Sequence, residues 1–138
     1  MPKKLKHLEL IQNVINRLAN SSFFLKGWTV IFVAAVLGFA TKDSKPMYVW
    51  LAAIPTLSFW GLDGFYLNQE RLFRRLYDIV RETDEDEIDF SMNTDPFKKS
   101  GDWFKAVFSK TLLPFYLTIL LVIGIVLLWQ LIEQSNGA

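Results

Sequence analysis

The sequence predicts an all-α integral membrane protein with three transmembrane helices, an N-terminal amphipathic helix and a short cytoplasmic helical region. Three observations support this fold class. Of the 138 residues, 51% are hydrophobic and 15% are aromatic, with a net charge of only +1. Three apolar stretches are each long enough to cross the roughly 30 Å of bilayer hydrocarbon. Basic residues also gather on one side of these stretches, which is typical of membrane proteins.

Residues 1–20 predict an amphipathic helix at the cytoplasmic or interfacial level. Its apolar residues recur at spacings of three and four, at Leu5, Leu8, Ile11, Ile15 and Leu18. Such a helix lies along the inner membrane surface or packs under neighbouring subunits. Polar residues interrupt the apolar core that a signal peptide needs, so a cleaved export signal is not expected.

Residues 21–67 predict a hairpin of two transmembrane helices. The first span runs from about Ser22 to Ala40, with Lys26 as its single charge. The second span runs from Met47 to Leu67. The loop between them is short and ends in proline, so the second helix returns antiparallel beside the first.

Residues 68–110 predict a cytoplasmic region in three parts. Because no glycine or proline separates residues 68–82 from the second span, we expect one continuous helix leaving the membrane. Residues 82–89 contain six acids in eight positions and form a linker without the glycine and ligand spacing of a calcium-binding EF-hand loop. Residues 96–110 mix aromatic residues with lysines, which suits an interfacial helix. The uncharged stretch 111–132 is the third span, and residues 133–138 form a short tail.

The distribution of charge predicts the orientation. Thirteen of the 15 basic residues lie before or just inside the first span, or between the second and third spans. Only Lys42 and Lys45 lie in the loop between the first two spans, and no basic residue follows the third. The positive-inside rule therefore places the N-terminus in the cytoplasm and the C-terminus outside a bacterial inner membrane.

Asp63 is the principal candidate site, because an acid at bilayer depth is costly unless it is paired or functional. Lys26 lies at a similar depth on the adjacent helix, so one interpretation is a buried ion pair that clamps the hairpin. The other is a ring of Asp63 carboxylates around a cation path, with Ser58 extending a polar stripe. Three spans enclose no pore alone, so the second interpretation requires a homo-oligomer.

Small residues mark positions where helices can approach closely. They are Ala34, Gly38, Gly61 and Gly64. Packing within one chain and packing between subunits explain them equally well.

Four arginines follow the second span and are candidates for binding membrane lipid or a cytoplasmic partner, namely Arg71, Arg74, Arg75 and Arg81. Arginines beside a membrane favour anionic lipid over nucleic acid. Cysteine is absent, and the only histidine, His7, is expected to be a solvated surface residue. Without a catalytic constellation, phosphate loop or metal-ligand cluster, no enzyme activity, cofactor or metal is expected.

The segment Leu62-Asp63-Gly64-Phe65-Tyr66-Leu67-Asn68-Gln69-Glu70-Arg71-Leu72-Phe73-Arg74-Arg75-Leu76-Tyr77 resembles the end of the membrane hairpin and the basic-aromatic helix of small bacterial SLATT-like effectors. The similarity covers roughly residues 5–82. It implies a pore-forming or membrane-disrupting protein of an anti-phage defence system, kept silent until infection is sensed.

The sequence thus favours a homo-oligomeric membrane channel or pore-forming effector that acts by ion leakage. In that hypothesis residues 68–82 and the acidic linker form a collar where a cytoplasmic regulatory protein or ligand binds. The alternative is a non-conducting membrane anchor or accessory subunit that docks a soluble cytoplasmic partner. Asp63 and Lys26 fit both.

Overall fold

The computed structural model describes residues 2–43 and 46–137, and helix accounts for 86% of the chain. Two long helices come first, α1 (Pro2–Asp43) and α2 (Pro46–Glu82). Two short 3-10 turns follow, η1 (Glu85–Glu87) and η2 (Asp95–Phe97), and then the short helix α3 (Asp102–Val107). The last helix is α4 (Leu113–Gly137). No strand occurs in these residues, so the all-helical prediction is confirmed.

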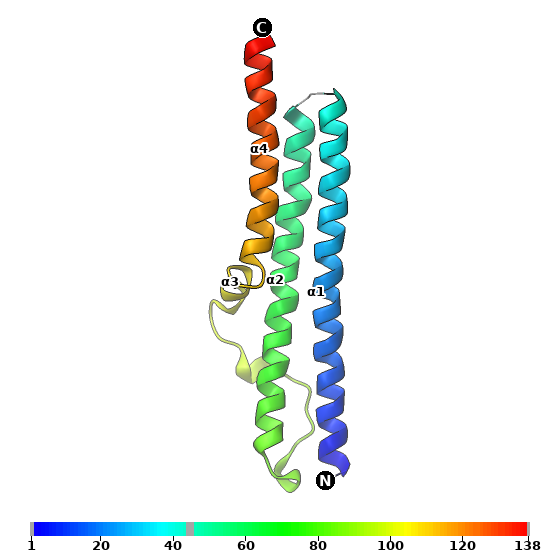
Figure 1. Cartoon of the computed structure of the whole chain (residues 1–138). Coiled ribbons are helices and arrows are strands. Elements are labelled where there is room, and N and C mark those ends of the chain that lie inside the picture. Colours follow the sequence, from blue (N-terminus) through cyan, green and yellow to red (C-terminus); the bar gives the residue numbers. More distant parts are fainter. Residues whose placement is uncertain (1, 44–45, 138) are drawn as a thin grey trace.

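The three long helices lie side by side, with α2 between α1 and α4 (Figure 1). α1 and α2 are antiparallel, and α4 runs back along the first half of α2. The segment that holds η1, η2 and α3 lies beside the second half of α2. The N-terminal and C-terminal ends of the described chain therefore lie at opposite ends of an elongated bundle.

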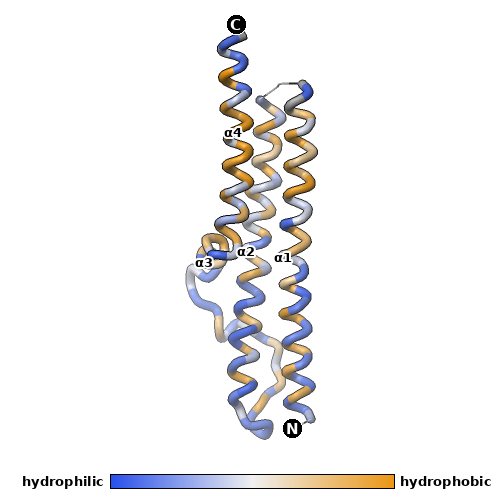
Figure 2. The backbone as a smooth tube through the Cα atoms, viewed as in Figure 1, coloured by the Kyte–Doolittle hydropathy of each residue, from blue (hydrophilic) through white to orange (hydrophobic). Residues whose placement is uncertain are grey.

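Within the described residues, two helices are long and apolar enough to cross a membrane, the stretch Pro2–Ala40 of α1 and the stretch Leu113–Asn136 of α4. Only 22% and 17% of their most apolar windows are buried, so both present apolar surface outward, unlike the core helix of a soluble protein. The first half of α2 is less apolar, because Pro55, Thr56, Ser58 and Asp63 interrupt it. Hydropathy is highest in the half of the bundle that carries the C-terminus (Figure 2).

The core is a seam that follows α2 along its length. In the apolar half, buried side chains of all three long helices meet: Val33 and Ala40 of α1, Val49 and Ala52 of α2, and Ile123 of α4. In the polar half, Ile11 and Ile15 of α1 pack against Leu76 and Val80 of α2. The apolar residues of each helix thus face a neighbouring helix along both halves.

The predicted amphipathic helix of residues 1–20 is not a separate element, because α1 continues without a break from Pro2 to Asp43. Residues 3–26 contain no glycine or proline, the two residues that most strongly interrupt a helix. The apolar face that was expected to lie on the membrane or under another subunit is buried against α2 instead, and Ile11 is 0% exposed.

The connection predicted for residues 96–110 is less helical than expected. Pro96 lies in the turn η2, and Gly101 adopts a φ of 80° immediately before α3. Helix in this segment is therefore limited to α3, six residues long. The predicted continuous helix through the end of the second apolar stretch is confirmed by α2, which extends to Glu82.

Candidate functional site

Asp63 lies at the point where α1, α2 and α4 meet, and its side chain is 0% exposed. Its carboxylate accepts three hydrogen bonds. Lys26 Nζ donates at 2.7 Å and Tyr116 Oη donates at 2.8 Å, while Ser22 Oγ is the third donor. Donors therefore come from both helices that flank α2. We call Ser22, Lys26, Asp63 and Tyr116 the charge cluster.

Two members of the charge cluster are fixed by helical spacing on α1. Ser22 and Lys26 are four residues apart, so they share one face of the helix. Lys26 Nζ also donates to Ser22 Oγ at 2.8 Å, and its ammonium lies 6.0 Å from the centre of the Phe115 ring. The side chain of Lys26 is 20% exposed, so it joins the buried carboxylate to the surface. A carboxylate with an opposite charge and further donors avoids most of the cost of burial.

Aromatic stacking positions Tyr116. Its ring is parallel to that of Trp60, with centroids 5.7 Å apart and an interplanar angle of 5°. Trp60 Nε1 donates to the carbonyl of Val107 at 2.9 Å. The same tryptophan of α2 therefore contacts both α4 and the end of α3, which holds the phenol toward Asp63.

The two glycines that flank Asp63 face α3. A Cβ on Gly64 would overlap Val107 Cγ2, so only glycine allows this approach. A Cβ on Gly61 would meet Trp103 Cζ2 at 3.6 Å, an ordinary contact, and Trp103 Nε1 donates to the Gly61 carbonyl at 3.1 Å. Gly61 and Gly64, both predicted as helix-packing positions, thus pack against α3 of the same chain.

The remaining predicted positions of the apolar stretches lie away from the charge cluster. Ala34 and Gly38 of α1 are exposed. Ser58 of α2 is also exposed, so the structure does not bring it together with Asp63 and Lys26.

Arg75 anchors the segment that precedes α3. Its Nη1 donates to the Phe97 carbonyl at 2.8 Å and to Asp102 Oδ2 at 3.2 Å. The backbone N–H of Lys99 also donates to Asp102 Oδ2, at 2.9 Å. These contacts hold the pKa of Asp102 below its ordinary value. The hydrogen bond from the Lys99 N–H has the larger effect, and that from the Arg75 guanidinium comes next. Arg75 thus holds the segment before α3 against α2.

The other three arginines differ in what they contact. Arg74 donates to Glu70 one helical turn away at 2.9 Å. Arg81 lies 3.7 Å from Glu82, on an exposed part of α2. Within the described residues, Arg71 makes no hydrogen bond or ion pair. Arg71 and Arg74 border one pocket together with Lys26.

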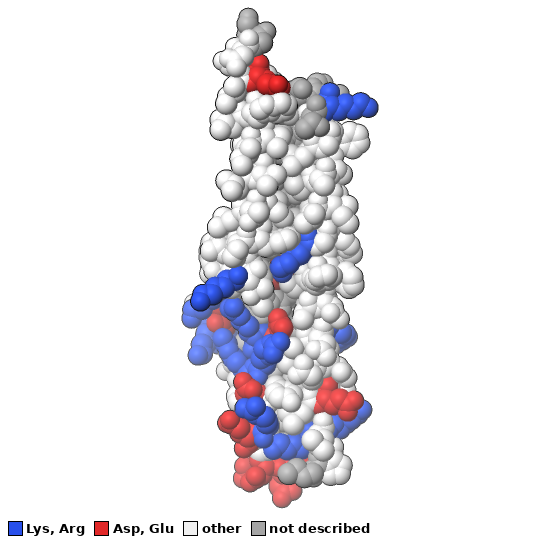
Figure 3. Space-filling view, viewed as in Figure 1, with Lys and Arg blue, Asp and Glu red and all other residues white. Residues whose placement is uncertain are grey.

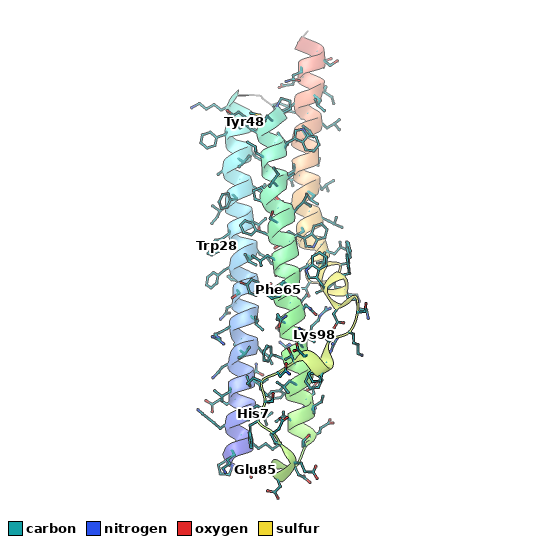
Figure 4. The ribbon with its side chains drawn as sticks, turned by 180° about the vertical axis from the view of Figure 1, so that it is seen from behind. His7, Trp28, Tyr48, Phe65, Glu85 and Lys98 are labelled. Carbon is teal, nitrogen blue, oxygen red and sulfur yellow. The ribbon has the colours of Figure 1, made fainter. Side chains whose placement is uncertain are left out.

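His7 is buried rather than solvated, with 4% of its surface exposed. Its ring contacts Phe90 edge to face, with centroids 5.4 Å apart, and its Nε2 has no hydrogen-bond partner among the described residues. The segment after η1 covers it, which the sequence pattern of α1 alone did not indicate. Figure 4 shows His7 and Glu85 at one end of the bundle, and Trp28 and Tyr48 in the other half.

Charge is concentrated in the half of the bundle that contains the N-terminus and the connecting segment (Figure 3). Acidic side chains gather at its extreme end, and basic side chains form a band nearer the middle. The described residues hold no group of three or more His, Cys, Asp or Glu side chains that fits a metal ion.

Sequence reasoning found Asp63 and Lys26 but missed Ser22, Tyr116 and Trp60. The spacing of Ser22 and Lys26 was a usable signal, because i and i+4 residues face the same way. The charge cluster can fix the rotation and depth of three helices, and its carboxylate is 0% exposed and already accepts three hydrogen bonds. Comparison with family models, curated proteins and solved structures finds no match to this chain.

Proposed function

We propose that this protein is a three-span membrane anchor, a non-conducting accessory subunit whose cytoplasmic half docks a soluble partner. One observation favours an anchor over a channel. Asp63 is fully buried, and donors on α1 and α4 of the same chain complete its hydrogen bonds. The charge cluster is a clamp that needs no second copy.

The arrangement of the helices supports three spans. α1 and α4 are the helices with sufficient length and apolarity, and the first half of α2 lies between them (Figure 1). A bilayer around α1 and α4 therefore also surrounds this half of α2. The polar residues of α2 are tolerated there, because Thr56 and Asp63 are 0% exposed and face neighbouring helices.

A cation path formed by a ring of Asp63 carboxylates would need those carboxylates exposed at its mouth. In this chain the carboxylate is covered, and the exposed Ser58 has apolar exposed neighbours such as Leu57 and Ile54. A homo-oligomeric channel, and with it the role of an anti-phage effector, would require the charge cluster to open. That hypothesis stays a prediction and is the alternative outcome of the test below.

The surface of the cytoplasmic half supports docking. Besides the acids of η1, it exposes large apolar side chains on both helices, including Leu5 and Leu10 of α1 and Ile79 of α2. Phe90 and Met92 of the connecting segment add to this surface. Mixed acidic and apolar surface suits a soluble partner with basic and apolar groups.

Ion flux through liposomes that contain the purified protein tests the proposal. We expect wild type and Asp63→Asn to give the same potassium and chloride flux as protein-free liposomes. Potassium-selective flux from wild type that is lost or altered in Asp63→Asn, with assembly unchanged, would overturn the anchor and support the channel. Ser100→Ala is the control, because it removes an exposed hydroxyl that lies outside the charge cluster and outside the polar stripe of the channel hypothesis.

A further inference from the structure

A pocket of about 540 Å³ opens beside the charge cluster, at the boundary between the apolar and the charged halves of the bundle. Ser22 and Lys26 of α1 line one side, and Glu70, Arg71 and Arg74 of α2 line the other. Thr111, just before α4, lines it as well. Cationic and hydroxyl groups from separate parts of the chain therefore meet around one space.

Donors remain available in this pocket after the internal contacts are made. The Lys26 ammonium has three N–H groups and uses two of them, on Asp63 and on Ser22. Arg71 has no hydrogen bond or ion pair within the described part of the chain, so its whole guanidinium is available. Arg74 uses Nη2 on Glu70 and keeps its other N–H groups.

The charge of the lining favours an anion. It contains three cations, Lys26, Arg71 and Arg74. Glu70 pairs with Arg74 at 2.9 Å and the buried Asp63 pairs with Lys26 at 2.7 Å, so the charge of Arg71 is left in excess. The planar guanidinium matches the oxygens of a phosphate and binds them through two parallel hydrogen bonds. An ammonium nearby adds a compact positive charge.

Part of the pocket lining is apolar. Phe23 and Leu67 line it, and Phe23 is 72% exposed on the outer surface of α1. In the proposed membrane location these side chains lie where phosphate headgroups meet acyl chains. A ligand with a phosphate and an adjoining apolar part therefore fits both kinds of lining.

We propose that this pocket binds a phosphate group, held by Arg71, Arg74 and the free N–H of Lys26. The source is either the headgroup of an anionic phospholipid or a soluble phosphate compound. The lipid source rests on the proposed membrane location. Binding there places a negative charge beside the exposed face of Lys26 and connects ligand occupancy to the charge cluster.

Calorimetry tests this proposal by measuring the binding of three probes, each titrated into the purified chain in a neutral detergent. The probes are a short-chain phosphatidylglycerol, inorganic phosphate and a short-chain phosphatidylcholine. We expect saturable binding of phosphatidylglycerol, weakened about tenfold or more when Arg71→Gln and Arg74→Gln are combined, because charge-assisted hydrogen bonds are lost. Arg81→Gln removes the same charge from the same helix outside the pocket and should leave the affinity unchanged.

The competition between probes identifies the source. Phosphatidylglycerol binding that inorganic phosphate does not displace assigns a lipid headgroup, whereas equal affinity for inorganic phosphate assigns a soluble phosphate compound. The site is overturned if wild type binds none of the probes, binds phosphatidylcholine as tightly as phosphatidylglycerol, or is matched in affinity by the double variant. Single Arg71→Gln guards against misfolding, since the Arg71 side chain makes no hydrogen bond or ion pair within the described residues. Because micelles require only the folded bundle, this result is independent of the flux test of the anchor.

Discussion

Replacing Asp63 with Asn should destabilise the bundle more than any change at an exposed polar position. The substitution keeps the size of the side chain but removes its charge. The amide keeps only one acceptor oxygen, so Ser22, which donates to Oδ1, and Lys26 and Tyr116, which donate to Oδ2, can no longer all find an acceptor. The ammonium of Lys26, with its side chain only 20% exposed, is left without an opposite charge.

The expected loss follows from two opposing effects. Removing one partner of a buried ion pair costs about 3–5 kcal/mol. Lys26, which is partly exposed, can extend its aliphatic stem toward the surface and recover part of the hydration of its charge. We therefore expect about 3 kcal/mol for Asp63→Asn, the lower end of that range. Tyr116→Phe, which keeps the ring on Trp60 and removes one hydrogen bond to a charged group, should cost about 1.5 kcal/mol.

Equilibrium unfolding in mixed micelles, followed by far-UV circular dichroism, measures both losses. Combining Asp63→Asn with Lys26→Met should cost less than the two single changes together, by at least about 1 kcal/mol, because the double variant leaves no unpaired charge. Ser58→Ala is the control and should stay within about 0.5 kcal/mol of wild type. A loss below about 1 kcal/mol for Asp63→Asn, or additive single changes, would refute the clamp.

Two further predictions concern α3 and the segment before it. Gly64→Ala should cost about 1–3 kcal/mol, because the new Cβ overlaps Val107 Cγ2, and adding Val107→Ala should restore stability. Gly61→Ala should be tolerated. Unfolding midpoints measure all three variants, and equal effects of the two glycine changes would contradict the close contact between Gly64 and Val107. Because the folded pKa of Asp102 is lowered, its contacts stabilise the loop above the ordinary value of 3.8 and are lost as pH falls through the folded pKa. Carboxyl NMR should show this low pKa rising in part in Arg75→Gln, and an unchanged titration in that variant would refute the Arg75 contribution.

The pairing of Asp63 with Lys26 could be predicted from sequence, since two antiparallel helices of known length bring residues at equal distances from the loop to equal depth. Tyr116 could not be predicted in the same way. Residues 111–132 are apolar on every side, so no periodicity indicates which face of α4 contacts α2. The stacking of Tyr116 on Trp60 and the fit of α3 against Gly64 determine that rotation.

The course of α1 was misjudged for a related reason. The apolar residues of its first twenty positions indicate an amphipathic helix, but they do not identify the surface that covers them. The matching stripe on α2, at Leu76 and Val80, lies more than fifty residues further along the chain. Pairing the two stripes gives a long hairpin, in which burial against α2 replaces contact with a membrane or another subunit.

Labelling single cysteines with a membrane-impermeant thiol reagent tests the three-span clamped bundle most directly, and the absence of natural cysteine makes the background clean. Three exposed positions are suitable: one near the end of α1, one between α2 and α3, and one near the end of α4. The variants are Lys42→Cys, Ser100→Cys and Gln134→Cys. In oriented vesicles we predict that Lys42→Cys and Gln134→Cys react from the outside, and that Ser100→Cys reacts only after the membrane is made permeable. Reaction of Lys42→Cys and Ser100→Cys from the same side would show that α2 does not cross, and would contradict the account.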